Sequence, residues 1–145
     1  MSRIRKLAAM GGVGVLMALA GAASAQEAPN LVGTWKGMAT VVHIGSNPYR
    51  VAESNGPNLP PNAVEMTYVF TKQDGNRFVG TSTNGKFTET VIGAISLDNR
   101  TGVALDDDGQ YTFTLRDLNT IDLCYAHSFP TSKVVGCWQI KRAAN

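Results

Sequence analysis

From residue 32 to residue 142 the chain consists of short runs in which apolar and polar residues alternate, separated by tight-turn signals. A period of two is typical of β-strands that bury one face, and the runs show no helical period of 3.6. Consecutive strands joined by tight turns are antiparallel neighbours, so the pattern predicts an all-β fold, an eight-stranded antiparallel up-and-down meander. The predicted strands cover residues 32–43, 64–72, 76–83, 86–98, 102–106, 110–116, 120–127 and 134–142.

Cys124 and Cys137 fix the register of the last predicted hairpin. If residues 129–132 form a four-residue loop, Cys124 lies opposite Cys137 on the polar face. The same register places Leu123 opposite Trp138 on the apolar face. Directly opposed residues have Cα atoms about 4.5–5.5 Å apart, which a disulfide spans. We therefore predict a disulfide on the outer face, which contributes about 3 kcal/mol by closing a short loop.

The other turns predict the remaining registers when each is read as a standard hairpin connection. Residues 73–75, 107–109 and 117–119 read as three-residue loops, and Asn84-Gly85 reads as a two-residue loop. Each turn independently keeps large apolar residues on one face. The predicted inward pairs are Phe70 with Phe78, Phe78 with Val91, Gly80 with Glu89, Ser82 with Phe87, Leu105 with Tyr111, Val103 with Phe113, Leu115 with Ile121 and Phe113 with Leu123.

Most of the aromatic residues share the predicted inner face. A sheet with one aromatic and one polar face buries its rings and removes its edges when it closes on itself, so we expect a β-barrel. A two-sheet β-sandwich is the alternative. The rings expected inside are Trp35, Tyr68, Phe70, Phe78, Phe87, Tyr111, Phe113, Tyr125 and Trp138.

Residues 1–25 have the pattern of a secretory signal peptide. Basic residues precede an apolar run that ends at Ala23-Ser24-Ala25, and cleavage is expected between Ala25 and Gln26. An N-terminal membrane anchor is the alternative reading. We expect residues 26–145 to form a single β-barrel domain without a membrane span, located in the periplasm or secreted.

Without the expected signal peptide, the rest of the chain is nearly neutral and contains both cysteines. Residues 26–145 carry 10 basic and 11 acidic side chains, so no basic surface is expected to attract nucleic acid. An oxidising compartment also favours a disulfide between the two cysteines over free thiols.

The segment Leu31-Val32-Gly33-Thr34-Trp35 begins the first predicted strand, and Arg142 lies in the last one. This combination resembles the calycin pattern shared by lipocalins and avidins, in which a Gly-x-Trp opens the barrel. The resemblance implies that Arg142 packs over the Trp35 ring in a cation–π contact at the closed end. It implies no ligand, because the C-terminal helix of lipocalins and the biotin contacts of avidins have no counterpart here.

A second resemblance concerns shorter motifs. Their combination is similar to that of a group of small exported prokaryotic barrel proteins, and this likeness supports the fold without implying an activity. The motifs are Tyr68-Val69-Phe70, Gln73-Asp74-Gly75, Asp107-Asp108-Gly109 and Cys124-Tyr125 with a second cysteine near the end.

Up-and-down strand order separates the two ends of the expected barrel. The end opposite Trp35, called the open end below, gathers the turns at 84–85, 107–109 and 129–132 and the proline-rich segment 45–62. Proline lacks the donor of a β-ladder, so residues 45–62 are expected to form a lid or surface loop, called the 45–62 loop. The candidate ligand-binding residues near this end are His43, Met66, Ser82, Phe87, Glu89, Tyr111, Tyr125 and His127.

These side chains allow two interpretations. Aromatic rings with a few convergent polar groups are typical of a small-molecule pocket, but the same rings also fill an eight-stranded barrel. An inward Glu89 needs water, a partner or a ligand. His43 and His127, with Glu89 or Asp106, offer ligand types that bind metals, but their spacing does not require one. Residues 106–109 read as a hairpin turn and lack the ligands of an EF-hand, so we predict neither metal nor cofactor.

No catalytic motif is present, so we expect a non-enzymatic protein without catalytic residues. The first hypothesis is an exported binding protein that takes a small apolar or aromatic ligand at the open end. The alternative is a protein–protein interaction module of the cell envelope, such as a protease inhibitor, acting through the 45–62 loop or residues 26–30. A hollow interior near Glu89 and Tyr111 favours the ligand, whereas a filled interior with an ordered, exposed loop favours the partner.

Overall fold

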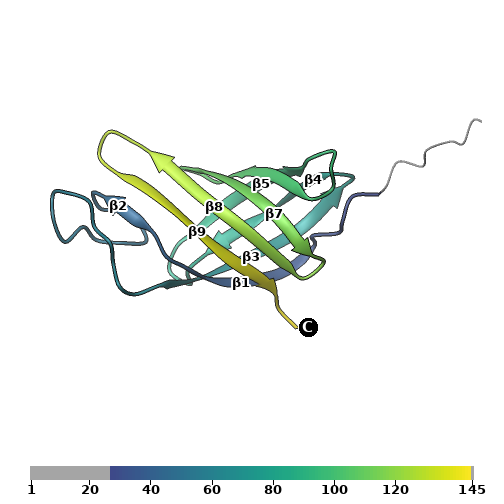
Figure 1. Ribbon diagram of the computed structural model, residues 1–145, viewed down its shortest axis with the longest axis horizontal. Coiled ribbons are helices and arrows are strands. Elements are labelled where there is room, and N and C mark those ends of the chain that lie inside the picture. The colour runs from purple at the N-terminus through teal and green to yellow at the C-terminus, as the bar shows by residue number, and fades with distance from the viewer. Residues whose placement is uncertain (1–26, 145) are drawn as a thin grey trace, which may run out of the picture.

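The computed structural model describes residues 27–144, so the expected signal peptide and its cleavage site lie outside the described residues. Within this range the chain is built from antiparallel strands, which confirms the all-β prediction (Figure 1). None of the described residues forms a helix long and apolar enough to cross a membrane. The strands are β1 (Gly33–Ala39), β2 (Val42–Ile44), β3 (Val64–Asp74), β4 (Arg77–Thr83), β5 (Thr88–Ile95), β6 (Thr101–Leu105), β7 (Gln110–Asp117), β8 (Thr120–Ser128) and β9 (Lys133–Arg142).

Eight of these strands close into a barrel. β1 and β3 to β9 pair with their neighbours in chain order, and β1 pairs with β9 to complete the ring. The up-and-down barrel is therefore confirmed, and the sandwich is not observed. The predicted strand 32–43 is interrupted at residues 40–41, after which the short β2 pairs with β9 beyond the point where β1 leaves it.

The closed end is organised around Trp35, which is fully buried. Its indole Nε1 donates a hydrogen bond to the Leu31 carbonyl at 2.8 Å. The Arg142 guanidinium lies 4.2 Å from the centre of the Trp35 ring, so the expected cation–π contact is present. Its Nη1 and Nη2 also donate to the carbonyls of Val32 and Asn30, each at 2.7 Å.

The last two hairpins have the predicted register. Cys124 pairs with Cys137 and Leu123 with Trp138, as a four-residue loop at 129–132 requires. The two cysteines form a disulfide with Cα atoms 4.0 Å apart. In the preceding hairpin Leu115 faces Ile121, again as predicted.

The predicted register between β6 and β7 is wrong by one residue. Leu105 pairs with Gln110 and Val103 with Thr112, so Leu105 and Val103 point outward and are half exposed. The reason is a four-residue turn in which the Asp106 carboxylate accepts hydrogen bonds from the backbone N–H groups of residues 108 and 109.

Gly102 turns inward as a result of this register, opposite Phe113. A Cβ at Gly102 would lie 2.1 Å from the Phe113 ring. Glycine is therefore required here by the close approach of the aromatic side chain rather than by backbone torsion.

The hairpin of β3 and β4 also differs from the prediction. A two-residue turn at Gly75-Asn76 replaces the expected three-residue loop, and Gly75 adopts the left-handed conformation with φ 59°. A β-bulge between Phe70 and Lys72 then restores the inward face. Phe70 consequently lies opposite Gly80, not Phe78, although the centroids of the two phenylalanine rings are 4.9 Å apart.

Between β4 and β5 the turn is longer than predicted. The Asn84 carbonyl oxygen Oδ1 accepts hydrogen bonds from the backbone of residues 86 and 87, which makes a four-residue loop. Ser82 therefore pairs with Glu89, and Gly80 with Val91. Phe87 lies in the loop and is 45% exposed, so its predicted inward position is wrong. The other eight rings expected inside form or border the core.

Candidate functional site

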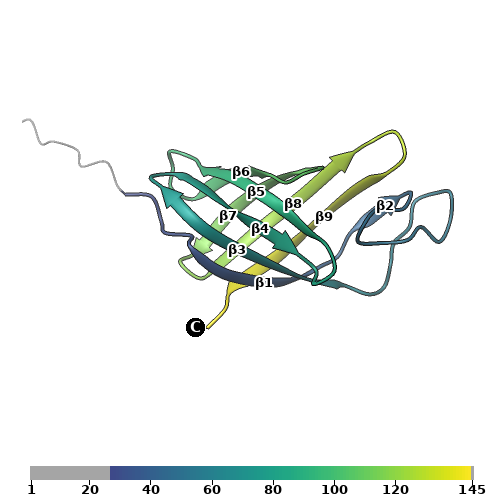
Figure 2. The same cartoon turned by 180° about the vertical axis from the view of Figure 1, so that it is seen from behind.

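The 45–62 loop lies at the open end, beside the tip of the β8–β9 hairpin (Figures 1 and 2). Its base is fastened by two backbone hydrogen bonds between His43 and Asn58, of 3.1 and 2.8 Å. Arg50 Nη2 donates to the Asn62 carbonyl at 2.9 Å and holds the far end of the loop. The loop is thus tied to itself and to the barrel wall.

A cavity of about 50 Å³ lies beneath this loop, at the level of Glu89 and Tyr111. Its apolar wall comes from β1, β3, β9 and the segment joining β1 to β2, through Ala39, Val41, Val64, Met66, Val134 and Trp138. A second cavity of about 20 Å³ lies among core side chains, and Tyr111 borders both. The aromatic core fills most of the remaining barrel interior.

Five of the eight candidate ligand-binding residues meet at this cavity: Met66, Glu89, Tyr111, Tyr125 and His127. The other three do not line it. His43 is buried in β2, where its Nδ1 lies 3.0 Å from the Gly45 carbonyl, and Ser82 is buried in β4, where it pairs with Glu89. Phe87 packs edge-on against the ring of Tyr49 outside the cavity, with 6.0 Å between centroids.

Five polar residues complete the cavity wall without having been predicted there as ligand contacts: Asn47, Tyr49, Arg50, Asp106 and Asp108. Asn47 and Tyr49 belong to the 45–62 loop, where no periodicity tells which side chains face inward. Asp106 and Asp108 belong to the acidic turn, in which the four-residue length directs both carboxylates toward the cavity. Trp138 was expected inside but not as part of a site.

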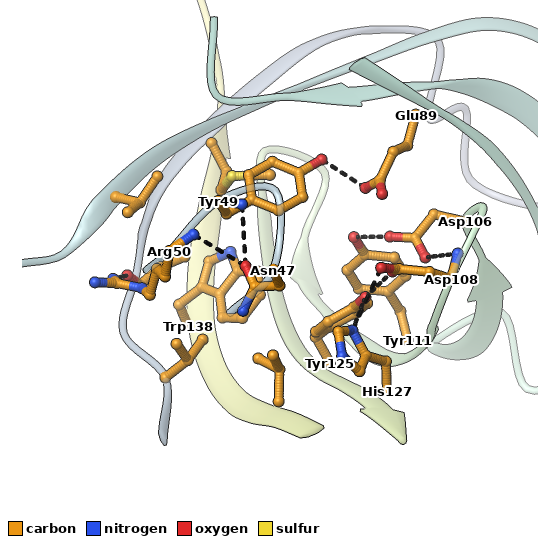
Figure 3. Close-up of a pocket in the computed structure, with 15 residues that line it drawn as sticks. Asn47, Tyr49, Arg50, Glu89, Asp106, Asp108, Tyr111, Tyr125, His127 and Trp138 are labelled. Atoms are coloured by element: carbon orange, nitrogen blue, oxygen red, sulfur yellow. Dashed lines mark hydrogen bonds and ion pairs between the residues drawn. The ribbon is translucent and has the colours of Figure 1, made fainter. Parts of the chain in front are cut away.

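Three carboxylates gather on one side of the cavity (Figure 3). Glu89, Asp106 and Asp108 each offer an oxygen atom, and these atoms lie within 4.8 Å of one another. Each carboxylate accepts a hydrogen bond from a different tyrosine: Tyr49 Oη to Glu89 Oε2 at 2.5 Å, Tyr111 Oη to Asp106 Oδ2 at 2.6 Å, and Tyr125 Oη to Asp108 Oδ1 at 2.5 Å. The Tyr49 bond links the 45–62 loop directly to the barrel.

The negative charge of this cluster has little compensation. Among residues 27–144 the one basic side chain within ion-pair distance of it is His127, whose Nδ1 lies 3.5 Å from Asp108 Oδ2. Burial raises the pKa of Glu89 to about 7, and repulsion from Asp106 and Asp108 adds to this, against the opposing effect of the Tyr49 hydrogen bond. Burial also raises the pKa of Asp106 above its usual range.

The tyrosines are held in their neutral, donating form. Burial is the main cause that raises the pKa of Tyr49, Tyr111 and Tyr125 well above the usual value of a phenol, and the nearby carboxylates add to it. His127 is buried below them, and its Nε2 lies 2.7 Å from Ser132 Oγ. Hydrogen bonds therefore hold the walls of the site, with the Tyr49–Glu89 pair separate from the bonds around Asp108 and His127.

Several buried polar atoms at or below the cavity have no hydrogen-bond partner. They include the donors Asn47 Nδ2 and Trp138 Nε1, both on residues that line the cavity, and the hydroxyls of Tyr68 and Ser82. An unpaired buried polar group costs about 1–3 kcal/mol. The native structure thus presents groups that a polar occupant would satisfy.

The three carboxylates are also the groups that could hold a hard metal ion such as Ca²⁺ or Mg²⁺. The Ser132 hydroxyl, which is bonded to His127, lies outside the cavity lining. No family model matches the chain, and no curated protein matches it.

Proposed function

We propose that this chain is an exported, non-enzymatic binding protein of calycin-like architecture that takes a small organic ligand at the open end of its barrel. Residues 1–25 would direct export and then be cleaved off, and the Cys124–Cys137 disulfide suits an oxidising periplasmic or extracellular location. The observation that carries the proposal is the cavity beneath the 45–62 loop, where aromatic and aliphatic walls meet a few convergent polar groups.

The size of the cavity limits the ligand. Pockets for drug-sized molecules occupy about 300–1,000 Å³, whereas this cavity measures about 50 Å³. The ligand is therefore compact, or its larger part extends outward when the 45–62 loop lifts. Met66 and Trp138 offer apolar contact surface in the cavity, so we expect the body of the ligand to be apolar.

Titration of the protein with a panel of small aromatic and aliphatic compounds tests this function. Trp138 lines the cavity, so its fluorescence reports occupancy. We expect Tyr111→Ala and Glu89→Ala to weaken binding, while the outward-facing neighbour variant Thr112→Ala leaves it unchanged. A panel without a single response, or equal losses in all three variants, contradicts the proposal.

A second candidate function is recognition of a protein partner of the cell envelope, for example as an inhibitor of a protease, through the 45–62 loop. The observation in its favour is that the ordered loop exposes two large apolar side chains, Val51 at 81% and Leu59 at 80%. Capture of a partner from envelope extract that is abolished by Val51→Ser and Leu59→Ser together, but not by Val103→Ser on the barrel wall, would support it. Capture that is insensitive to the loop variant argues against it.

A further inference from the structure

We propose that the ligand is a compact primary amine with a hydrogen-bond acceptor at its other end. Its ammonium group binds among Glu89, Asp106 and Asp108, and its acceptor meets the free donors of Asn47 and Trp138. This inference rests on the proposed function, since it names the class of ligand that the cavity takes.

The carboxylate side of the cavity has the dimensions of an ammonium site. Three oxygen atoms that lie within 4.8 Å of one another are close enough for one nitrogen atom to approach all three. Charge-assisted hydrogen bonds from nitrogen to a carboxylate measure about 2.7–2.9 Å. A primary ammonium carries three N–H donors, one for each carboxylate.

Charge favours the same occupant. The cluster has no lysine or arginine within ion-pair distance among the described residues, and Arg50, which also lines the cavity, donates to the Asn62 carbonyl. The three hydrogen bonds from tyrosines stabilise the carboxylates but do not neutralise them. A ligand cation supplies the missing positive charge.

The opposite side of the cavity offers donors instead of acceptors. The Asn47 Oδ1 atom accepts two backbone hydrogen bonds from Tyr49 and Arg50, which orients its Nδ2 group away from them. Nδ2 of Asn47 and Nε1 of Trp138 are buried and unpaired. Figure 3 places Asn47 and Trp138 across the cavity from the carboxylates. The two poles therefore require complementary groups at the two ends of one molecule.

The Tyr68 hydroxyl is a further buried polar group beside the cavity wall. Tyr68 is 2% exposed, and its Oη has no hydrogen-bond partner of good geometry. Tyr111 and Trp138, which line the cavity, are the side chains near enough to act on that hydroxyl as hydrogen-bond partners, and Asp106 acts on it by its charge. Tyr68 itself borders the second, smaller cavity, so the direct contacts of the occupant come from the residues that line the first.

A metal ion fits this site less well than an amine. Ca²⁺ requires six to eight oxygen ligands at about 2.3–2.6 Å, whereas the carboxylates that gather here number three, with one ligand oxygen counted from each. Much of the remaining wall is apolar, through Met66 and Val134 among others. Contact with that apolar surface would favour the binding of an organic ligand, because apolar area leaves water. It would not favour the binding of a hydrated ion.

Four probes of equal size separate the two features of the ligand. Ethanolamine has both the ammonium and the acceptor, n-propylamine has the ammonium alone, propan-1-ol has one hydroxyl alone, and ethylene glycol is the neutral counterpart of ethanolamine. Binding is followed at pH 8 by the NMR signals of the two indole N–H groups. The Trp138 signal reports the cavity, and the Trp35 signal, whose N–H is bonded to the Leu31 carbonyl, is the internal reference.

We expect ethanolamine to bind about tenfold or more tightly than ethylene glycol, because a charge-assisted hydrogen bond is worth at least that factor. It should bind about threefold or more tightly than n-propylamine, and its saturation should move the Trp138 signal and not that of Trp35. Ligands of this size reach dissociation constants of about 0.1–10 mM, so the titration covers that range.

Matched variants locate the effect. Glu89→Gln should remove most of the preference for ethanolamine over ethylene glycol, whereas Asp107→Asn, in the same acidic turn but exposed and outside the cavity, should retain it. Trp138→Phe, followed by calorimetry, should remove the preference for ethanolamine over n-propylamine. The comparison of the four probes on the unaltered protein does not depend on the folding of any variant.

Several results overturn the inference. Equal affinities for ethanolamine and ethylene glycol do so, as does an equal loss in Glu89→Gln and Asp107→Asn. Displacement of ethanolamine by micromolar CaCl₂ would assign the carboxylates to a metal. If aromatic compounds of the wider panel bind while ethanolamine does not, the inference fails and the proposed function stands; if neither set binds, the proposed function fails.

Discussion

Replacement of Glu89 by glutamine should stabilise the unliganded protein above pH 7. Burial and repulsion raise the pKa of this carboxyl from an ordinary 4.5 to about 7 in the folded state. Between these two values the folded chain binds more protons than the unfolded chain, so the contribution of Glu89 to stability falls as the pH rises through this window. Glutamine keeps an acceptor for the Tyr49 hydroxyl and carries no charge.

The size of the effect follows from the same shift. A change in the pKa from 4.5 to about 7 corresponds to about 3 kcal/mol if it is fully expressed. Solvent reaches part of this half-buried carboxyl, and screening reduces the contribution to about 1–2 kcal/mol. We therefore expect Glu89→Gln to raise the free energy of unfolding by about 1–2 kcal/mol at pH 8 and by much less at pH 5.

Urea denaturation at pH 5 and pH 8, followed by tryptophan fluorescence, measures this difference. Glu65→Gln is the matched control, because Glu65 is exposed on the outer face and pairs with Lys36 only at 3.8 Å. Its stability should follow that of the unaltered protein at both pH values. The reasoning is refuted if Glu89→Gln is less stable than the unaltered protein at pH 8. It is also refuted if the substitution changes the free energy of unfolding equally at both pH values.

Three further substitutions probe the scaffold by urea or thermal denaturation. The double variant Cys124→Ala, Cys137→Ala should lose about 3 kcal/mol, because it releases the loop that the disulfide closes. Arg142→Lys should lose about 1–3 kcal/mol, since lysine lacks the planar fork that binds two backbone carbonyls. Gly102→Ala should lose about 1–3 kcal/mol, because its Cβ would overlap the Phe113 ring.

Controls for these substitutions come from the same chain. Arg77→Lys changes an exposed arginine that pairs with Asp74 and should alter stability by less than about 0.5 kcal/mol. Gly56→Ala adds a Cβ whose nearest neighbour, Ser54 Oγ, is 4.0 Å away. If either control lowers the free energy of unfolding as much as its partner variant does, the stated contacts are not the cause of the lost stability. An unchanged stability of the reduced protein would contradict the expected effect of the disulfide.

The closed barrel and the disulfide hairpin could be predicted because short stretches of sequence, single strands and single turns, determine them. Alternation tells which residues of a strand share a face, and the loop at 129–132 has one length that satisfies both Cys124–Cys137 and Leu123–Trp138. The register of β6 could not be predicted in this way. Residues 106–109 suit a three- or a four-residue turn, and the choice depends on hydrogen bonds of the Asp106 side chain that alternation does not encode.

The candidate site shows the same limit. Glu89, Tyr111, Tyr125 and His127 were placed near the open end because they lie on strands of known direction, and all four line the cavity. Tyr49 was not predicted, because its position depends on how the 45–62 loop folds back over the barrel. The 45–62 loop has no periodicity, so its sequence gives no comparable rule for which side chains face the barrel.

The pairing of the first strand with the last has a consequence for how the protein is made. β1 (Gly33–Ala39) leaves the ribosome early, but its partner β9 (Lys133–Arg142) is the last strand to emerge. Until then both β1 and β8 present open edges, which invite pairing with other chains. Biogenesis therefore depends on keeping the nascent polypeptide apart from its neighbours until the final ten-residue strand is free to seal the wall.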